Sequence, residues 1–423
     1  MIYRKFNLQT FASNQLQYIF SVINKKARAV RTKSCLDRLG DQDEAMCNGE
    51  YTTSDEDSHN HSVMKSNKMS KYAIMFSYLG RGYYGIQRSP AVPTIEEELL
   101  KAMYKAGVIS KQHYLNPYDL WYQKASRTDK GVSALRQIVS LFLEKDIDTK
   151  SVIEKINTEI CAQIKVMGIK KAIKTFDAKN NCYARSYSYT MPTLAFCPVE
   201  ELCTENYRLS GKILKKVNKI LKKFEGVHNY QNFTSSREAR EKGCVRNIMS
   251  CECGQPFLYK GVEFVVIRIK GQSFMLHQIR NMIGLAIAIV RGLADLKTLK
   301  RNLTAEKIKY PMAPGLGLVL EEVHYDSYNW KYGGKGIVEQ LSWEECQNEV
   351  HRFKTNLIQP DILETEISEK SMMKWLEDCF YYSYEAADKK PSDGKLYAAV
   401  AHLKRLRKIE ETDKRLLDAV PNR

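Results

Sequence analysis

The sequence lacks any apolar segment long enough to cross a membrane. Its longest apolar run, Met282 to Val290, spans nine residues, whereas a helix needs about 20 to span a bilayer. A transmembrane protein is therefore excluded. At 423 residues and 48.8 kDa, the chain is long enough for two or three domains.

Paired cysteines are also lacking. The 11 cysteines are an odd number, are scattered and include no C-x-x-C pair, which favours a reducing compartment over a disulfide scaffold. The tightest group is Cys244, Cys251 and Cys253. A zinc site there would need a fourth ligand at a suitable spacing, so we predict no metal site.

Acidic side chains are scarce relative to basic ones. Lys and Arg number 66 against 49 Asp and Glu, giving a net charge of +17 and a pI near 9.2. Such an excess says nothing about the fold, but it favours a polyanionic partner, nucleic acid first and an acidic membrane surface second.

The N-terminal region changes character twice. Residues 1–34 carry seven basic side chains and no acidic one, which is typical of a mitochondrial targeting segment. A disordered basic arm is the alternative. Residues 37–57 then carry eight acids against one base, so we predict a disordered linker over 35–70. The predicted localisation is mitochondrial, nuclear or both.

From about Lys71 onward, strand and helix patterns alternate. Thr94 and Glu97 have the spacing of a capping box at the start of an amphipathic helix. Further helices are predicted over 151–164, 206–224, 274–291 and parts of 367–416, and strands over 72–78, 135–143, 183–190, 245–253, 262–270 and 316–323. We predict an α+β fold with two similar halves, 71–198 and 199–330, around a mostly antiparallel sheet. A basic, partly helical extension covers 331–423.

A glycine-rich stretch, Gly80 to Gly85, matches the dinucleotide pattern G-x-G-x-x-G. That motif requires a helix to begin inside it, whereas here the helix begins only at Thr94. We therefore reject a dinucleotide site. Tyr83, Tyr84, Gln87 and Arg88 instead predict a flexible, basic, aromatic loop that lies against a phosphate backbone.

A second loop contains Asp129 between two apolar strands. An ordinary surface turn is one interpretation, because Asp and Gly are common in turns. The alternative is a catalytic carboxylate. Arg127 and Lys130 would keep Asp129 ionised if they lie close to it, as a nucleophile or base requires.

Two further segments combine apolar patterning with polar residues. Strict alternation places Tyr183, Arg185, Tyr187 and Tyr189 on one face of a strand, either as a core face or as a platform for a nucleobase. Helical spacing places His277, Arg280 and Asn281 on one face of the 274–291 helix.

A buried Arg280 would need an anionic partner. That partner is a structural acid, a phosphate or a site carboxylate, and Asp129 is the attractive candidate.

Lysine-rich segments complete the pattern. Residues 212–223 hold six lysines and no acid, opposite an apolar stripe, and the tail from Lys389 to Arg415 is also basic. Each segment is either a solvated helix face or a surface for phosphates.

Taken in order, these segments resemble the TruA family of tRNA pseudouridine synthases, in its eukaryotic branch. The resemblance covers about residues 71–330. Six family motifs carry it, namely Y-x-G-x-x-Y-x-G-x-Q-R, R-T-D-K-G-V-S-A, R-x-Y-x-Y, H-N-F-x-N-F-T, G-x-S-F-x-x-H-Q-I-R-x-M-x-G and A-P-G-L-G-L-x-L, at 78–88, 127–134, 185–189, 228–234, 271–284 and 313–320. The sequence departs from the family pattern at Tyr230, where the family more often has Phe, at Ser126 and at Ile86.

The resemblance implies the pseudouridine synthase fold, with a cleft between the halves, and assigns roles to individual residues. Asp129 would be the catalytic aspartate, Arg127 would help hold a flipped nucleotide, Tyr187 would stack on the uracil, and Arg280 would pair with Asp129. Arg185, Gln87, Arg88 and His277 would also contact the substrate, and Leu318 or Leu320 would line the pocket.

The implied activity is isomerisation of specific uridines to pseudouridine in tRNA, in the anticodon stem and loop region. It uses no cofactor and no metal. The partners would be tRNA and, as further candidates, other RNAs, with no membrane, and the enzyme would be a monomer or a homodimer. The alternative is a catalytically silent tRNA-binding protein or chaperone of the same fold.

Overall fold

The computed structural model describes residues 68–201, 203–235, 243–304, 311–379, 382 and 384. The predicted targeting segment, nearly all of the predicted linker and the basic tail from Lys389 lie outside the described residues. Within the described ranges, no helix has both the length and the apolar character that crossing a membrane demands.

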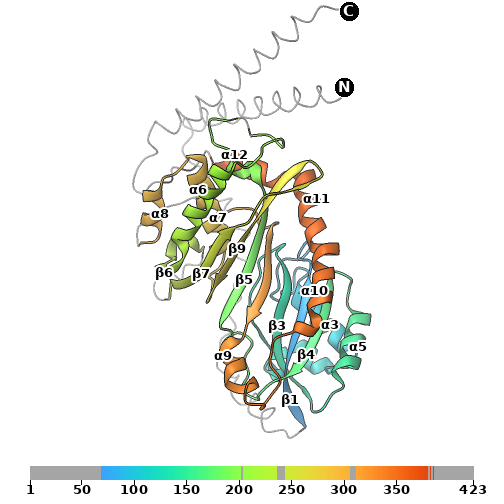
Figure 1. The fold of residues 1–423 in the computed structure, drawn as a ribbon. Coiled ribbons are helices and arrows are strands. Elements are labelled where there is room, and N and C mark those ends of the chain that lie inside the picture. The colour runs from blue at the N-terminus through green and yellow to red at the C-terminus, as the bar shows by residue number, and fades with distance from the viewer. Residues whose placement is uncertain are drawn as a thin grey trace, which may run out of the picture. The chain divides into compact units, whose positions relative to one another are not determined.

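One large sheet runs through the described part of the chain (Figure 1). Its strand order is β4-β1-β3-β10-β5-β9-β7-β6, with β2 paired to β3 and β8 to β9. All pairings are antiparallel except that of β10 with β3, which confirms the prediction of a mostly antiparallel sheet. The strands are β1 (Met69–Tyr78), β2 (Gln123–Lys124), β3 (Ser133–Glu144), β4 (Ile164–Lys171), β5 (Ala184–Pro192), β6 (Gly226–Asn229), β7 (Val245–Cys253), β8 (Phe257–Tyr259), β9 (Val262–Gly271) and β10 (Leu318–His324).

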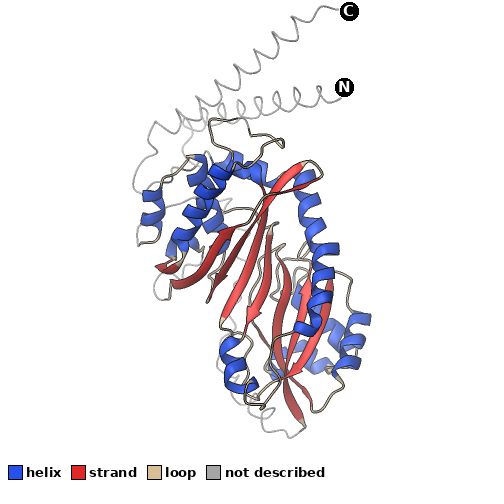
Figure 2. Cartoon of the chain, viewed as in Figure 1, coloured by secondary structure: helices blue, strands red, loops and turns tan. Residues whose placement is uncertain are grey.

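Helices accompany the sheet along its length, so the fold is α+β as predicted (Figure 2). They are α3 (Ile95–Lys105), α4 (Lys111–Leu115), α5 (Thr149–Glu159), α6 (Gly211–Leu221), α7 (Gln278–Arg291), α8 (Leu296–Asn302), α9 (Asp326–Tyr328), α10 (Gln347–Phe353), α11 (Gln359–Glu369) and α12 (Ser371–Asp378). Short 3-10 or π-helical turns occupy Pro117–Leu120, Thr193–Phe196, Lys222–Phe224, Gln231–Phe233, Asn329–Gly333, Glu344–Cys346 and Lys354–Ile358.

The centre of the sheet joins segments that are distant in sequence. Strand β10 lies between β3 and β5, and Leu320 is in register with Ala134 of β3 on one side and Tyr187 of β5 on the other. Because β3 directly follows the Asp129 loop, this register brings that loop to the level of Tyr187. The sheet topology therefore positions the candidate site.

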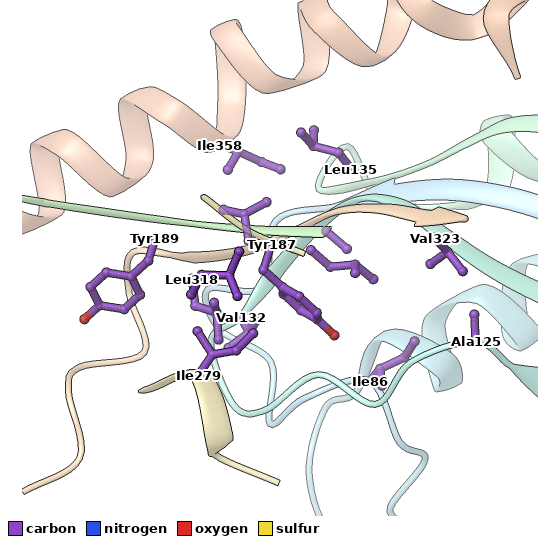
Figure 3. Close-up of a cluster of buried hydrophobic side chains, with 14 of the residues drawn as sticks. Ile86, Ala125, Val132, Leu135, Tyr187, Tyr189, Ile279, Leu318, Val323 and Ile358 are labelled. Atoms are coloured by element: carbon purple, nitrogen blue, oxygen red, sulfur yellow. The ribbon is translucent and has the colours of Figure 1, made fainter. Parts of the chain in front are cut away.

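A long helical run covers the sheet face opposite Tyr187. It comprises α10, a π-helical turn over Lys354–Ile358 and α11, and Figure 3 shows Ile358 on the far side of the strands from Tyr187. Lys354 Nζ pairs with Glu321 of β10 at 2.7 Å, and Glu321 also accepts a hydrogen bond from Ser188 of β5. Small residues on this face of β5 leave room for the helix.

Several predicted helix boundaries were wrong for local reasons. The helix predicted over 151–164 ends at Glu159, and the strand that follows it, β4, was not predicted. The 206–224 helix begins only at Gly211, because the Ser210 hydroxyl accepts a hydrogen bond from Ile213 N and caps it there. The 274–291 helix begins at Gln278, because His277 has a left-handed backbone with φ of 63°.

The predicted capping box at α3 is absent, although the helix itself is present. Thr94 is extended but its side chain makes no cap hydrogen bond. Glu97 instead accepts hydrogen bonds from Arg88 and Tyr114. The helix is stabilised by its buried face, which includes Ile95, Leu99 and Met103.

Candidate active site

The Asp129 carboxylate faces the first turn of α7. His277 Nε2 lies 3.6 Å, and Arg280 Nη1 3.8 Å, from Asp129 Oδ2. The three side chains are 18%, 22% and 15% exposed for Asp129, His277 and Arg280 respectively, so water screens the interaction only in part. The positive end of the α7 helix dipole also faces Asp129 and adds to the favourable electrostatic potential at its carboxylate.

Main-chain and side-chain contacts hold the start of α7 in place. Arg280 Nε donates a 2.8 Å hydrogen bond to the Ala313 carbonyl, and Asn281 donates one of 2.9 Å to the Phe233 carbonyl. His277 Nδ1 lies 2.8 Å from the Ser235 hydroxyl. His277 and Arg280, which face Asp129, are therefore each oriented by a further hydrogen bond, to Ser235 and to Ala313 respectively.

The cations beside Asp129 in sequence do not pair with it. In the part of the chain that the structure describes, neither Arg127 nor Lys130 forms an ion pair with Asp129. Lys130 Nζ lies 4.0 Å from the centre of the Tyr84 ring, and Arg127 is exposed. Neighbouring side chains in a turn diverge, so neither of these two cations supplies the close pairing that was predicted to keep Asp129 ionised.

The glycine-rich stretch packs directly on the Asp129 loop and was wrongly predicted to be flexible. Ile86 N donates to the Thr128 carbonyl at 3.2 Å, and Gly131 N to the Tyr83 carbonyl at 3.1 Å. A Cβ on Gly80 would collide with the Val132 carbonyl, and one on Gly85 would lie 2.7 Å from the Thr128 carbonyl. These glycines are needed because the two backbones approach closely.

Replacing Gly85 by Ala should displace the Asp129 loop. Gly85 has φ of +95°, so the substitution combines an unfavourable backbone with a collision, and we expect a loss of about 2–3 kcal/mol in stability. Gly82→Ala is the matched control, because Gly82 has φ of +88° but nothing within 4 Å of its Cβ. Thermal melting and turnover of both variants would check this. Equal effects at the two positions would show that the close approach is unimportant.

Tyr187 belongs to an apolar cluster beside the Asp129 loop. Figure 3 shows it with Val132, Leu318 and Ile279, which come from the chain after Asp129, from β10 and from α7. The ring is 8% exposed, and Phe274 packs edge-on against it at 5.2 Å. Burial raises the pKa of the Tyr187 hydroxyl to about 12, and the nearby Asp129 charge adds to this.

The other tyrosines of this strand differ from Tyr187. Tyr189 is 1% exposed and donates a 2.7 Å hydrogen bond to the Pro314 carbonyl, so it is a core residue. Tyr183 is 42% exposed. The four alternating residues thus form neither a pure core face nor a single platform.

Arg185 is bound within the protein. Its guanidinium donates hydrogen bonds to the carbonyls of Gln272 at 2.9 Å, Ala125 at 2.9 Å and Lys179 at 3.1 Å. The first two of these carbonyls lie shortly before His277 and Asp129 in the chain. Arg185 was predicted to contact substrate, and the geometry indicates that it positions the two loops.

The basic residues of the glycine-rich stretch also have protein partners. Arg88 pairs with Glu97 and donates a 2.6 Å hydrogen bond to the Tyr114 carbonyl. Arg81 Nε lies 2.6 Å from Asp361 of α11. Gln87 is exposed. Of the two predicted contact residues here, Gln87 and Arg88, the arginine side chain is held by the protein.

Sequence patterns missed several supporting residues. Tyr78 and Thr128 share a buried 2.7 Å hydrogen bond that anchors the Asp129 loop to β1. Ser235 contacts His277, and Phe274 contacts Tyr187. Phe274 lies inside the G-x-S-F motif at 271–284, so the sequence did contain a signal that this residue belongs to the site. A single serine such as Ser235 carries no pattern at all.

The described residues contain no group of three or more His, Cys, Asp or Glu side chains that could hold a metal ion. Cys244, Cys251 and Cys253 are buried thiols. Burial raises the pKa of Cys253 to about 12, so this thiol is a poor metal ligand at neutral pH.

Comparison with known proteins gives consistent matches. A family model described as tRNA pseudouridine synthase matches residues 220–326. The chain is 43% identical over 312 residues to mouse "Pseudouridylate synthase 1 homolog", covering 72% of this chain and 73% of that one. It is 42% identical to the human protein of that name, covering 74% of each.

A yeast protein and a solved structure extend the comparison. Yarrowia lipolytica "tRNA pseudouridine synthase 1" is 31% identical, with 70% of this chain and 71% of the relative covered. A crystal structure of a Cbf5-Nop10-Gar1 complex covers 70% of this chain and 66% of its own at 11% identity. Its TM-score of 0.26 is too low to bear on the fold.

Proposed function

The chain belongs to the TruA family of tRNA pseudouridine synthases and is an isomerase. On that premise we propose that it converts specific uridines in tRNA to pseudouridine, with Asp129 as the catalytic carboxylate. The observation that carries the proposal is the carboxylate of Asp129 between His277 and Arg280, beside the buried ring of Tyr187. We place the target uridines in the anticodon stem and loop region.

The reaction requires little beyond one well-placed carboxylate. The N1–C1′ bond of uridine breaks, the base turns, a C5–C1′ bond forms, the C5 proton is lost and N1 gains a proton. An ionised Asp129 can attack C1′ as a nucleophile or remove a ribose proton as a base. Both routes need the carboxylate against the ribose, and neither consumes a cofactor or an energy source.

The residues around Asp129 have complementary roles in this proposal. Tyr187 packs against the uracil and retains it while it is detached. The target uridine must leave the RNA stack, at a cost of a few kcal/mol. Arg127 is exposed and not paired with Asp129, so its guanidinium is available to hold the backbone of the flipped nucleotide. Arg280 and His277 orient the carboxylate.

Single-turnover conversion of a tRNA transcript tests the proposal. With tritium at C5 of uridine, each isomerisation releases one tritium to water. We expect release by the purified protein with chelator present and no cofactor added. Binding of the transcript without release would favour the catalytically silent RNA-binding protein.

Helix α6 presents a basic face for the RNA backbone in this proposal. Lys212, Lys215 and Lys219 are exposed. Two neighbouring lysines are not assigned to the RNA backbone because they have partners within the protein. The Lys216 ammonium donates a 2.9 Å hydrogen bond to the Val290 carbonyl at the end of α7, and Lys222 pairs with Glu225 at 2.9 Å.

Replacing Lys212, Lys215 and Lys219 by Ala should flatten the salt dependence of binding. Each phosphate contact contributes about 0.7–0.9 to the slope of log affinity against log salt, so we expect a decrease of about 2. The rate at saturating enzyme should not change. The control replaces three exposed lysines near α5, Lys145, Lys150 and Lys155. If the slope is the same for both variants, α6 is only a solvated face.

We also propose that residues 1–34 direct the protein to mitochondria, because their composition is basic and free of acidic side chains. Fused to a fluorescent reporter, this segment should be imported, whereas a variant with its seven basic residues changed to Gln should not be. A reporter that stays wholly outside mitochondria would favour the basic-arm interpretation.

A further inference from the structure

An open surface recess of about 670 Å³ lies away from Asp129. Tyr183, Asp326, Ser327, Trp330 and Lys331 line it. Trp330 is 78% exposed and Tyr183 42%. Two aromatic rings therefore reach water at one recess, where their faces are available to stack on a flat ligand.

The recess is continuous with the active-site strand. Tyr183 N donates a 2.8 Å hydrogen bond to the His324 carbonyl, which extends the pairing of β5 with β10 by one residue. Alternation then places Tyr183 on the same side as Tyr187, four residues or about 13 Å away. An RNA strand with its target base at Tyr187 can therefore reach the recess with a neighbouring nucleotide.

The lining residues suit a base and not a phosphate. Aromatic faces stack on any nucleobase, and the Asp326 carboxylate is an acceptor for exocyclic amino or ring N–H groups. The same carboxylate would repel a phosphate, whereas Lys331 of the same lining can attract the phosphate that adjoins the bound base. This combination of ring, acceptor and cation is how proteins hold unpaired bases.

We propose that this recess binds an unpaired nucleobase of the RNA near the target uridine, with Trp330 as the stacking platform. The proposal rests on the proposed function, since it takes the RNA to be the substrate. It assigns a second contact along β5 that selects RNA with an unpaired base at that distance from the target.

Binding of labelled tRNA to full-length protein carrying Asp129→Asn tests the recess without any turnover. Trp330→Ala should weaken the affinity about tenfold, since stacking loss is of this order, and Trp330→Phe should restore it to within threefold. Tyr118→Ala, at another aromatic residue that is 62% exposed, should change nothing. An affinity within twofold of the parent for Trp330→Ala would overturn the proposal, and a protein partner would then be the better occupant.

Tryptophan fluorescence gives an independent measurement. Of the four tryptophans, Trp343 and Trp375 are only 3% and 9% exposed and Trp121 is half-buried, so the measurement uses a protein in which Trp121 is replaced by Phe. In that protein an unpaired oligonucleotide should quench mainly Trp330, and the quenching should disappear when Trp330→Phe is added. Quenching that persists in Trp330→Phe would overturn the assignment. Because neither assay requires catalysis, a protein that fails to isomerise uridine would disprove the proposed function and leave the recess as an RNA site.

Discussion

Asp129→Asn should lower the single-turnover rate of pseudouridine formation by at least about a thousandfold. The amide keeps the size of the side chain and one acceptor oxygen near His277 and Arg280, but it can neither attack C1′ nor take a ribose proton. Affinity for tRNA should stay within a few-fold, because phosphate contacts elsewhere supply most of the binding. Tritium release and filter binding measure the two quantities.

Two further variants make that result interpretable. Asp129→Ala excludes recovery of activity through slow deamidation of the amide. Asp146→Asn changes a side chain that is 68% exposed and pairs with Lys171, and it should turn over like the parent. Substantial turnover by purified Asp129→Ala would remove the aspartate from the chemistry.

Arg280→Ala should reduce both stability and activity. The Arg280 side chain is 15% exposed, contacts Asp129 and donates to the Ala313 carbonyl. Removing it leaves a largely buried carboxylate with one cation fewer, and we expect a loss of about 3 kcal/mol in unfolding free energy. The rate should fall because Asp129 is no longer held in position.

Urea denaturation and single-turnover kinetics measure these effects. Arg280→Lys should regain part of the stability and little of the rate, because an ammonium cannot bond Ala313 and reach Asp129 with the same geometry. Arg352→Ala on the exposed face of α10 is the control. Unchanged melting and unchanged turnover in Arg280→Ala would show that the pairing with Asp129 is incidental.

Local patterns predicted individual elements well. Strand β7 has the predicted bounds, β1 and β9 differ from prediction at one end, and β3, β5 and β10 differ by one or two residues at both ends. The short strands β2, β6 and β8, and strand β4, were not predicted. The order of strands could not be obtained this way. The register of Leu320 with Ala134 and Tyr187 joins three segments distant in sequence, and periodicity contains no information about such pairings.

The helical run from α10 to α11 shows a different limit of prediction from sequence. Apolar residues at helical spacing, including Val350, Phe353 and Ile358, are present in the sequence, but helices were predicted only from residue 367 onward in this part of the chain. The structure places a π-helical turn over Lys354–Ile358 just before Pro360. Such a turn lets the helix continue past a residue that cannot donate a hydrogen bond.

The candidate site was predicted in part. Helix periodicity placed His277 and Arg280 on one face, and both lie near Asp129. The roles given to Arg127 and Lys130 relied on sequence proximity, which says little about side-chain direction in a turn. The glycines at positions 80 and 85 indicated backbone freedom, but the sequence could not show that another backbone lies against them.

The most direct test of the account is a structure of the Asp129→Asn variant bound to tRNA, which should retain the substrate unreacted. The measurement is the distance from the side chain at position 129 to C1′ of the flipped uridine. We predict about 3–3.5 Å, the range for reacting groups in a productive complex, with the uracil packed against Tyr187. A target uridine still stacked in the RNA, or bound away from position 129, would contradict the assignment of Asp129 as the catalytic carboxylate.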